Sequence, residues 1–214
     1  MSHYNKIAGQ NVKRVEALSD GVFAIAFTLL VLEIKVPAAE HITTETGLLQ
    51  SLTPLLPKFL SYFLSFMTMG IFWTGQSTQF NYIERYDRNL NWMTLFFLLV
   101  ISLFPFTTAF LGEHIHFKLA IAFYWLNILL AGIFIYYHWV YAKKHQFLSI
   151  EGEALKEIDR ALRKRVIIAQ ALYLGGALLC FIHPYLSIGF IILVQLNYAF
   201  AIIPGRRVAT DKRR

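Results

Sequence analysis

The 214-residue chain is 57% hydrophobic and only 15% charged, with a mean hydropathy of +0.50. An ordinary globular protein is about 45–50% apolar and about 25% charged. These values exclude a disordered chain, a disulfide-rich secreted module and a water-soluble enzyme core. Cys180 is the single cysteine of the sequence, which excludes an intramolecular disulfide and a zinc site built on cysteines.

The first apolar segment covers residues 15–36 and carries Glu16, Asp20, Glu33 and Lys35. A helix needs about 20 mostly apolar residues to cross a hydrocarbon core of about 30 Å, so this segment is long enough to span a membrane. A cleaved signal peptide would end in an Ala-x-Ala-type site, and none follows the segment. The sequence therefore predicts that this helix is retained as the first transmembrane span.

Further segments along the chain have the length and low charge of membrane spans. They cover about residues 55–80, 89–112, 118–142, 164–182 and 184–204. Pro105 is the one plausible helix break in the third span, and His183-Pro184 predicts a tight turn between the last two. We therefore expect an all-α polytopic membrane protein with six transmembrane helices in a single domain, residues 1–214.

The basic residues predict the orientation of these spans. Of the 20 Lys and Arg residues, only Lys35, Lys58 and Lys118 fall on one side of the membrane in this arrangement. Because cytoplasmic loops are enriched in Lys and Arg, we expect both termini in the cytoplasm. The net charge is +7, but the basic residues flank the helix ends and do not form one face that could bind a nucleic-acid groove. Nucleic acid is therefore not an expected partner. Residues 149–165 predict a short cytoplasmic helix that lies against the membrane or leads into the fifth span.

The first helix is unusual because it concentrates the charges found inside the predicted spans. At 100° per residue, one stripe of this helix holds Arg14, Leu18, Gly21, Ile25, Thr28 and Leu32. Asp20 lies on another face, where its carboxylate needs a partner inside the protein. Two interpretations are open. Either Ser19 and Asp20 cap or anchor a helix that packs in the ordinary way, or the helix packs against symmetry mates and its stripe lines a pore.

A family resemblance favours the second interpretation. The sequence RVEALSD at residues 14–20 resembles the R-x-x-x-F-S-D signature of the transmembrane protein 175 family of potassium channels. The third span, NLNWMTLFFLLVISLFPFTTAFLGE, is similar to the family's N…PF-T-x-x-LGE pattern. A single six-span repeat resembles the prokaryotic form, which implies a homotetramer in the cell membrane of a prokaryote. Leu18 stands where Phe is usual, and Gln76 stands where many relatives have His, so the polar contacts of the first helix are expected to differ.

The resemblance also implies roles for individual residues. It implies that the first helices line a central pore, with Ile25, Thr28, Leu29 and Leu32 as the pore-lining and selectivity residues. It implies that Arg14, Ser19 and Asp20 are structural residues that hold this helix to its neighbours. The expected protein is a potassium channel, modestly selective over sodium, whose partners are the lipid bilayer and monovalent cations. We expect no cofactor apart from the permeant K⁺.

The gating mechanism is inferred from motifs that the chain lacks. No TVGYG-type carbonyl filter occurs in the sequence, so a hydrophobic constriction on the first helix is the expected gate. No segment resembles a voltage-sensing helix with Arg at every third residue, so we expect a leak-like conductance. A cation secondary transporter is the alternative, although a transporter would favour internal repeats, broken helices and an ionisable group near the midplane.

Other candidate sites in the sequence are weak. An intramembrane enzyme would need a nucleophile and base, paired carboxylates or a metal triad, and the corresponding motifs are absent, so we do not expect an enzyme. His114 and His116 share a loop without a third fixed ligand, which favours a structural role over a metal site. His138 falls in a Tyr- and Trp-rich run that is typical of an aromatic belt at the cytoplasmic interface.

Overall fold

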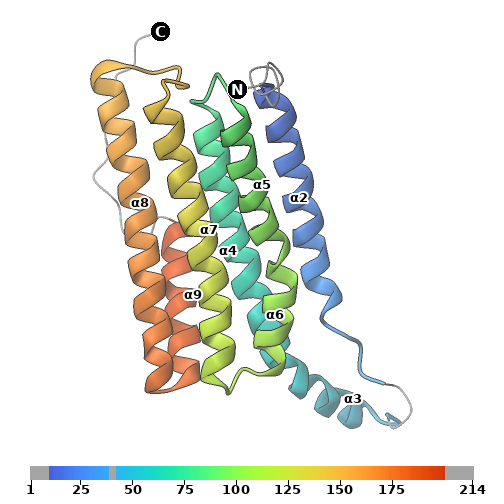
Figure 1. The fold of residues 1–214 in the computed structure, drawn as a ribbon. Coiled ribbons are helices and arrows are strands. Elements are labelled where there is room, and N and C mark those ends of the chain that lie inside the picture. Colours follow the sequence, from blue (N-terminus) through green and yellow to red (C-terminus); the bar gives the residue numbers. More distant parts are fainter. Residues whose placement is uncertain (1–9, 39–41, 201–214) are drawn as a thin grey trace.

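The computed structural model describes residues 10–38 and 42–200, with the side chain of residue 200 left out, and regular structure within these ranges is helical. Figure 1 shows the long helices side by side, with α2 at one edge of the bundle and α8 at the opposite edge. The predicted all-α fold class is therefore confirmed. The helices are α2 (Val12–Leu32), α3 (Glu45–Leu52), η2 (Thr53–Leu55), α4 (Leu56–Phe80), α5 (Arg88–Ser102), α6 (Phe104–Glu113), α7 (Lys118–Lys144), α8 (Gly152–Leu178), η3 (Leu179–Phe181) and α9 (Pro184–Phe200).

Five helical stretches of the described chain are long and apolar enough to cross a membrane. They contain α2, α4, the pair α5 and α6, α7, and α8, and within the described residues α9 is a shorter apolar helix. Residues 201–204 of the predicted sixth span lie outside the described residues. The first helix ends at Leu32, four residues before the end of the predicted first span. The individual boundaries of the six spans remain predictions, because helix length and composition do not locate the bilayer.

The third predicted span is broken where the sequence places Pro105. Helix α5 ends at Ser102, and α6 begins at Phe104, with Pro105 in its first turn. Proline is tolerated there because the first N–H groups of a helix have no intrahelical acceptor. The break leaves α6 packed on α4, where Thr108 Oγ1 lies 2.6 Å from Ser65 Oγ.

Helix α8 is continuous over 27 residues, from Gly152 to Leu178. Of the two arrangements predicted for residues 149–165, the structure therefore has the one that leads directly into the next apolar segment. Two glycines allow the close packing of this region. A methyl group on Gly132 of α7 would overlap the side chain of Gln170, and one on Gly176 would lie 2.7 Å from Ile191 of α9.

Helix α3 was not predicted from the sequence. It is an exposed helix of 8 residues, and Thr44 caps it by accepting a hydrogen bond from the Gly47 N–H at 3.0 Å. Figure 1 places it at the end of the bundle opposite the α7–α8 connection. Two helical turns are too few to establish a hydrophobic period, which explains why the pattern gave no signal.

One end of the bundle brings three basic parts of the chain together. The connection after α4 pairs with the connection after α7, because Ile83 forms an isolated β-bridge with Leu148, and the Ser149 N–H donates to the Tyr82 carbonyl at 2.8 Å. Val15, near the start of α2, belongs to the same buried cluster as Ile83. The basic residues near the start of α2 therefore lie at the same end as both connections, as their distribution in the sequence predicted.

Candidate functional site

Helix α2 has one face packed against the rest of the chain. Its buried residues recur every three or four positions, and they contact α4, α5 and α6. Phe23 is 1% exposed, and its ring centroid lies 6.1 Å from that of Phe97 in α5. This face supplies the apolar burial that holds α2 in the bundle. The buried residues are Val15, Ser19, Phe23, Ala26 and Leu30.

The opposite face of α2 is apolar and exposed. Ile25 is 61% exposed, Leu29 41% and Leu32 67%, and Thr28 is exposed between them. The structure thus brings the predicted pore-lining residues together on one continuous surface. A contiguous apolar surface of this kind is unfavourable in water, so it marks contact with lipid, with another subunit or with a narrow pore.

Thr28 interrupts this apolar surface with a single hydroxyl. Its Oγ1 donates a hydrogen bond to the Ile25 carbonyl at 2.8 Å. Because a hydroxyl has one hydrogen and two lone pairs, this arrangement leaves the oxygen free to accept. Thr28 can therefore offer an oxygen to a cation or to water without losing its own hydrogen bond.

Asp20 finds its partner on α4. Its Oδ1 accepts a hydrogen bond from Trp73 Nε1 at 2.9 Å. This hydrogen bond joins the first half of α2 to α4. Sequence reasoning required a partner for Asp20 but did not identify Trp73. The sequence did contain one indication of this contact, because Trp73 stands three residues before Gln76 and both side chains therefore lie toward the same side of α4.

Ser19 joins α2 to α4 at a second point. Gln76 Nε2 donates to Ser19 Oγ at 3.3 Å, and Ser19 Oγ donates to the Val15 carbonyl at 3.0 Å. Both side chains are buried. Gln76 therefore contacts Ser19 through a side-chain amide, a group that carries no charge at any pH.

Arg14 is not brought into this network. The N-cap residue of α2 is Asn11, whose Oδ1 accepts a hydrogen bond from the Arg14 backbone N–H at 3.1 Å. The Arg14 side chain itself is exposed. Among residues 10–38 and 42–200, its guanidinium forms no hydrogen bond or ion pair. Of the three predicted structural residues, Ser19 and Asp20 form hydrogen bonds to α4, whereas within the described ranges the Arg14 side chain forms none.

A groove of about 650 Å³ runs beside α2. Asp20, Phe23, Ala24 and Phe27 form its α2 wall, and Ala24 and Phe27 lie on the same face of α2 as Asp20. Its other walls come mainly from α4, with Arg165 and Tyr198 at the far side. The groove is mostly apolar, so α2 has an unfilled flank next to its exposed stripe.

His114 and His116 pack against aromatic rings in this structure. The His114 ring lies 4.9 Å from the Phe110 ring, and the His116 ring lies 5.6 Å from that of Tyr185. In the part of the chain that the structure describes, no group of three or more His, Cys, Asp or Glu residues could hold a metal ion. These aromatic contacts agree with the structural role expected for the two-His loop.

The aromatic-belt interpretation of His138 is wrong. His138 is only 3% exposed, and its two ring nitrogens are bound by Tyr86 Oη at 2.5 Å and Gln79 Oε1 at 2.8 Å. Gln79 in turn donates to the Ile135 carbonyl at 2.9 Å. Burial raises the pKa of the Tyr86 phenol well above its usual value, so Tyr86 stays neutral in this network.

Comparisons with known proteins identify the family of this architecture. Residues 14–105 match the family described as the endosomal/lysosomal potassium channel TMEM175. Two relatives are named potassium channels. One from Chryseobacterium is 33% identical over 91% of this chain and 94% of its own, and one from Chamaesiphon minutus is 35% identical over 87% and 92%.

A solved structure shares the fold. It is the crystal structure of a lysosomal potassium-selective channel TMEM175 homolog from Chamaesiphon minutus, with a TM-score of 0.74 and 31% identity. The match covers 89% of this chain and 97% of that one. These likenesses, together with the long apolar helices, identify a multi-pass membrane protein. The chain belongs to the TMEM175 family of potassium channels and is not an enzyme.

Proposed function

We propose that four copies of this chain surround a central axis, and that the exposed face of α2 lines the pore through which potassium passes. The observation that carries this proposal is the combination of a tightly anchored α2 and its exposed apolar stripe. A helix that only served packing would not need Trp73 and Gln76 to fix its rotation while leaving Ile25 and Leu32 uncovered. The groove beside α2 offers room for part of a neighbouring subunit.

Potassium is the proposed permeant ion, with no cofactor. The names of the two bacterial relatives and of the solved homolog support it. Ile25 and Leu32 are separated by seven residues, or about 10 Å along the helix axis. In a fourfold assembly their side chains form two apolar rings, and a narrow apolar ring gates a pore by excluding water.

Thr28 is the proposed source of the modest preference for potassium. A ring of four Thr28 oxygens between the apolar rings replaces part of the water shell of a passing ion. Sodium is smaller and holds its water more tightly, so a site with few oxygens penalises sodium more than potassium. Leu29 lies at the edge of the same surface, where its side chain narrows the proposed pore further.

The proposed location is the cell membrane of a prokaryote, with both termini in the cytoplasm. Three described basic residues, Lys35, Lys58 and Lys118, lie toward the end of the bundle that carries α3, whereas the others lie toward the end that carries the α7–α8 connection. The enrichment of cytoplasmic loops in Lys and Arg supports this orientation. The conductance is proposed to be leak-like.

Cysteine accessibility tests the pore proposal directly. Cys180, the single cysteine, is buried, so Cys180→Ser provides a background without a native thiol. Purified protein is reconstituted in liposomes, and potassium flux is measured before and after a charged thiol reagent. We expect the reagent to change flux in the variants Ile25→Cys, Thr28→Cys and Leu32→Cys.

Matched controls come from the flank of the same helix. Ala24 and Val31 are exposed on α2 but lie away from the stripe, so Ala24→Cys and Val31→Cys should leave the flux unchanged by the reagent. Equal effects at both sets of positions contradict the pore assignment. A flux that saturates and requires a second ion supports the transporter alternative instead.

A further inference from the structure

Helix α8 carries a basic surface far from the proposed pore. Lys156, Arg160, Arg163 and Lys164 recur at helical spacing and border a shallow hollow of about 530 Å³, whose apolar part is Ile167 and Ile168. We call these six residues the α8 basic face. They are exposed on a helix at the edge of the bundle opposite α2 (Figure 1), so an assembly around α2 leaves this face on the outside.

The α8 basic face lies where the helix changes from charged to apolar. Between Val166 and Ile182 the sequence contains no Asp, Glu, Lys or Arg. The apolar part stays exposed along its length, with Ile167 54%, Leu174 42% and Leu178 54% exposed. Cations followed by an exposed apolar stripe match a phospholipid, whose charged headgroup sits above its acyl chains.

Part of the charge of this face is paired within the helix, because Lys156 Nζ lies 2.7 Å from Glu153 Oε1 and the Arg163 guanidinium lies 3.8 Å from Asp159 Oδ2. Asp159, the one carboxylate in the hollow, is already held by Lys143 Nζ at 2.6 Å and by Trp139 Nε1 at 3.0 Å. Within the described ranges, no ion pair joins Arg160 or Lys164 to a carboxylate. The face therefore keeps an excess of positive charge that favours an anionic ligand.

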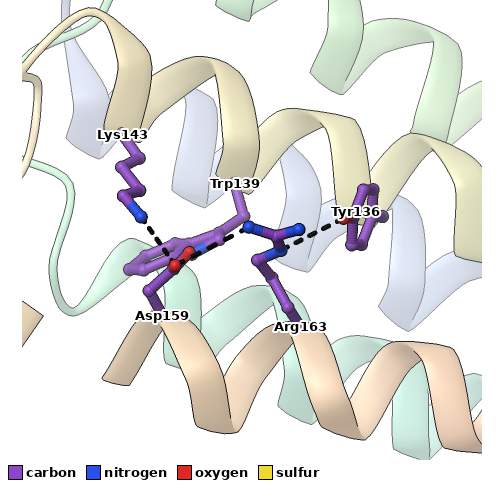
Figure 2. Close-up of polar contacts among 5 residues, drawn as sticks. All are labelled: Tyr136, Trp139, Lys143, Asp159 and Arg163. Carbon is purple, nitrogen blue, oxygen red and sulfur yellow. Dashed lines mark hydrogen bonds and ion pairs between the residues drawn. The ribbon is translucent and has the colours of Figure 1, made fainter. Parts of the chain in front are cut away.

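Arg163 is held in a fixed orientation within the face. Figure 2 shows its side chain between Asp159 and Tyr136, with its Nε donating to Tyr136 Oη at 3.1 Å. Its guanidinium also lies 5.5 Å from the centroid of the Tyr136 ring and 3.8 Å from Asp159 Oδ2. These contacts leave terminal N–H groups of the guanidinium available, and the planar fork of Arg suits bidentate binding of a phosphate.

We propose that the α8 basic face binds the headgroup of an anionic phospholipid of the phosphatidylglycerol class. Arg160, Arg163 and Lys164 contact the phosphate, and the acyl chains lie along the exposed apolar stripe below Ile167. Charge complementarity selects an anionic headgroup, and the apolar stripe selects a lipid over a free anion. The outward position of this face rests on the proposed assembly around α2, but lipid binding is measured separately from ion flux, so failure of one proposal is distinguishable from failure of the other.

Native mass spectrometry of the full-length protein tests the proposal. The protein is titrated in detergent with dioleoyl phosphatidylglycerol and, in parallel, with dioleoyl phosphatidylcholine, and bound lipids per subunit are counted. We expect phosphatidylglycerol to bind more tightly. Each basic residue near an anionic lipid surface contributes about fivefold in affinity, so Arg160→Gln combined with Lys164→Gln should weaken phosphatidylglycerol binding roughly 25-fold.

The matched control removes the same charge elsewhere at the same end of the bundle. Lys13 and Arg85 are exposed on other elements, and Lys13→Gln combined with Arg85→Gln should leave the affinity unchanged. Equal loss in both double variants overturns the proposal, because it indicates general attraction to the basic end. No loss in the α8 variant, or equal binding of phosphatidylcholine, also overturns it.

Two further arms identify the occupant. If millimolar inorganic phosphate displaces the lipid, the face binds a free anion, and the lipid assignment is overturned. The same spectra report the number of subunits, so a change in oligomeric state without a change in lipid binding identifies a second copy of the chain as the occupant and also overturns it. Retention of lipid in phosphate, with an unchanged subunit number, supports the proposal.

Discussion

Ile25 and Thr28 lie one turn apart on α2 and offer opposite chemistry to whatever faces them. Ile25 presents an apolar side chain that is 61% exposed, and Thr28 presents a hydroxyl oxygen whose hydrogen is already bonded. At the scale of single residues, the proposed pore therefore separates into a barrier to water and a site for ions. Each part has its own test.

The barrier is tested by Ile25→Asn. An amide side chain is hydrated where an isoleucine excludes water, so we expect conductance to rise severalfold in single-channel recordings in planar bilayers. Ile133→Asn, at an exposed isoleucine of α7, is the control and should leave conductance unchanged. Unchanged currents in Ile25→Asn would remove Ile25 from the constriction.

The ion site is tested by Thr28→Ala. Removal of the hydroxyl oxygen should lower the potassium-over-sodium permeability ratio, because potassium then loses its replacement for water. Thr28→Ser keeps the oxygen and should keep the ratio. The measurement is the reversal potential under bi-ionic conditions, and an unshifted reversal potential in Thr28→Ala would show that selectivity arises elsewhere.

At the scale of helices, α2 is fixed to α4 by Trp73 and Gln76. Trp73→Phe removes the N–H that binds Asp20 and leaves a carboxylate without this donor. We expect the free energy of unfolding to fall by about 1 kcal/mol, seen as a lower melting temperature in detergent. Trp92 is similarly exposed, 48% against 43%, and Trp92→Phe should have little effect. Equal melting temperatures of the two variants would contradict a role for the Asp20–Trp73 bond.

Helices α7 and α8 are joined by a second polar cluster, shown in Figure 2. Asp159 is 8% exposed and accepts hydrogen bonds from Trp139 and Lys143. Asp159→Ala leaves both donors without their acceptor, so we expect a loss of about 1–3 kcal/mol in the free energy of unfolding. Asp159→Asn keeps an acceptor for Trp139 and should lose less.

The control for this cluster is an exposed ion pair on the same helix. Lys156 Nζ lies 2.7 Å from Glu153 Oε1, but the two side chains are 69% and 88% exposed. Exposed pairs of this kind contribute about 0–1 kcal/mol, so Glu153→Ala should leave the melting temperature nearly unchanged. If Glu153→Ala destabilises the protein as much as Asp159→Ala, the difference in burial has no effect on these pairs.

At the scale of the whole molecule, the proposed pore requires more than one copy of the chain. One subunit leaves Ile25, Leu29 and Leu32 uncovered along a single helix, which cannot enclose an ion path. We expect four copies of the 24.7 kDa chain per particle in native mass spectrometry of detergent-purified protein. A monomer that still conducts potassium would contradict the proposed arrangement of α2 around an axis.

The features predicted from the sequence are those set by local pattern. The apolar segments, the break near Pro105 and the gathering of basic connections at one end follow from composition and chain order. The exposed stripe of α2 also follows from the sequence, because a helix with 3.6 residues per turn fixes which of its own residues share a face. The eight-residue α3 was missed because it is too short to show a period.

The sequence by itself determined the helical membrane architecture and the residues that share the α2 stripe, because both depend on neighbours along the chain. Tertiary structure alone decided which partners these residues meet. The Asp20–Trp73 and Ser19–Gln76 contacts join residues 53 and 57 positions apart, and His138 is buried against Tyr86, 52 positions away. Such contacts depend on how separate helices are rotated against one another, and the period of a single helix contains no information about that rotation.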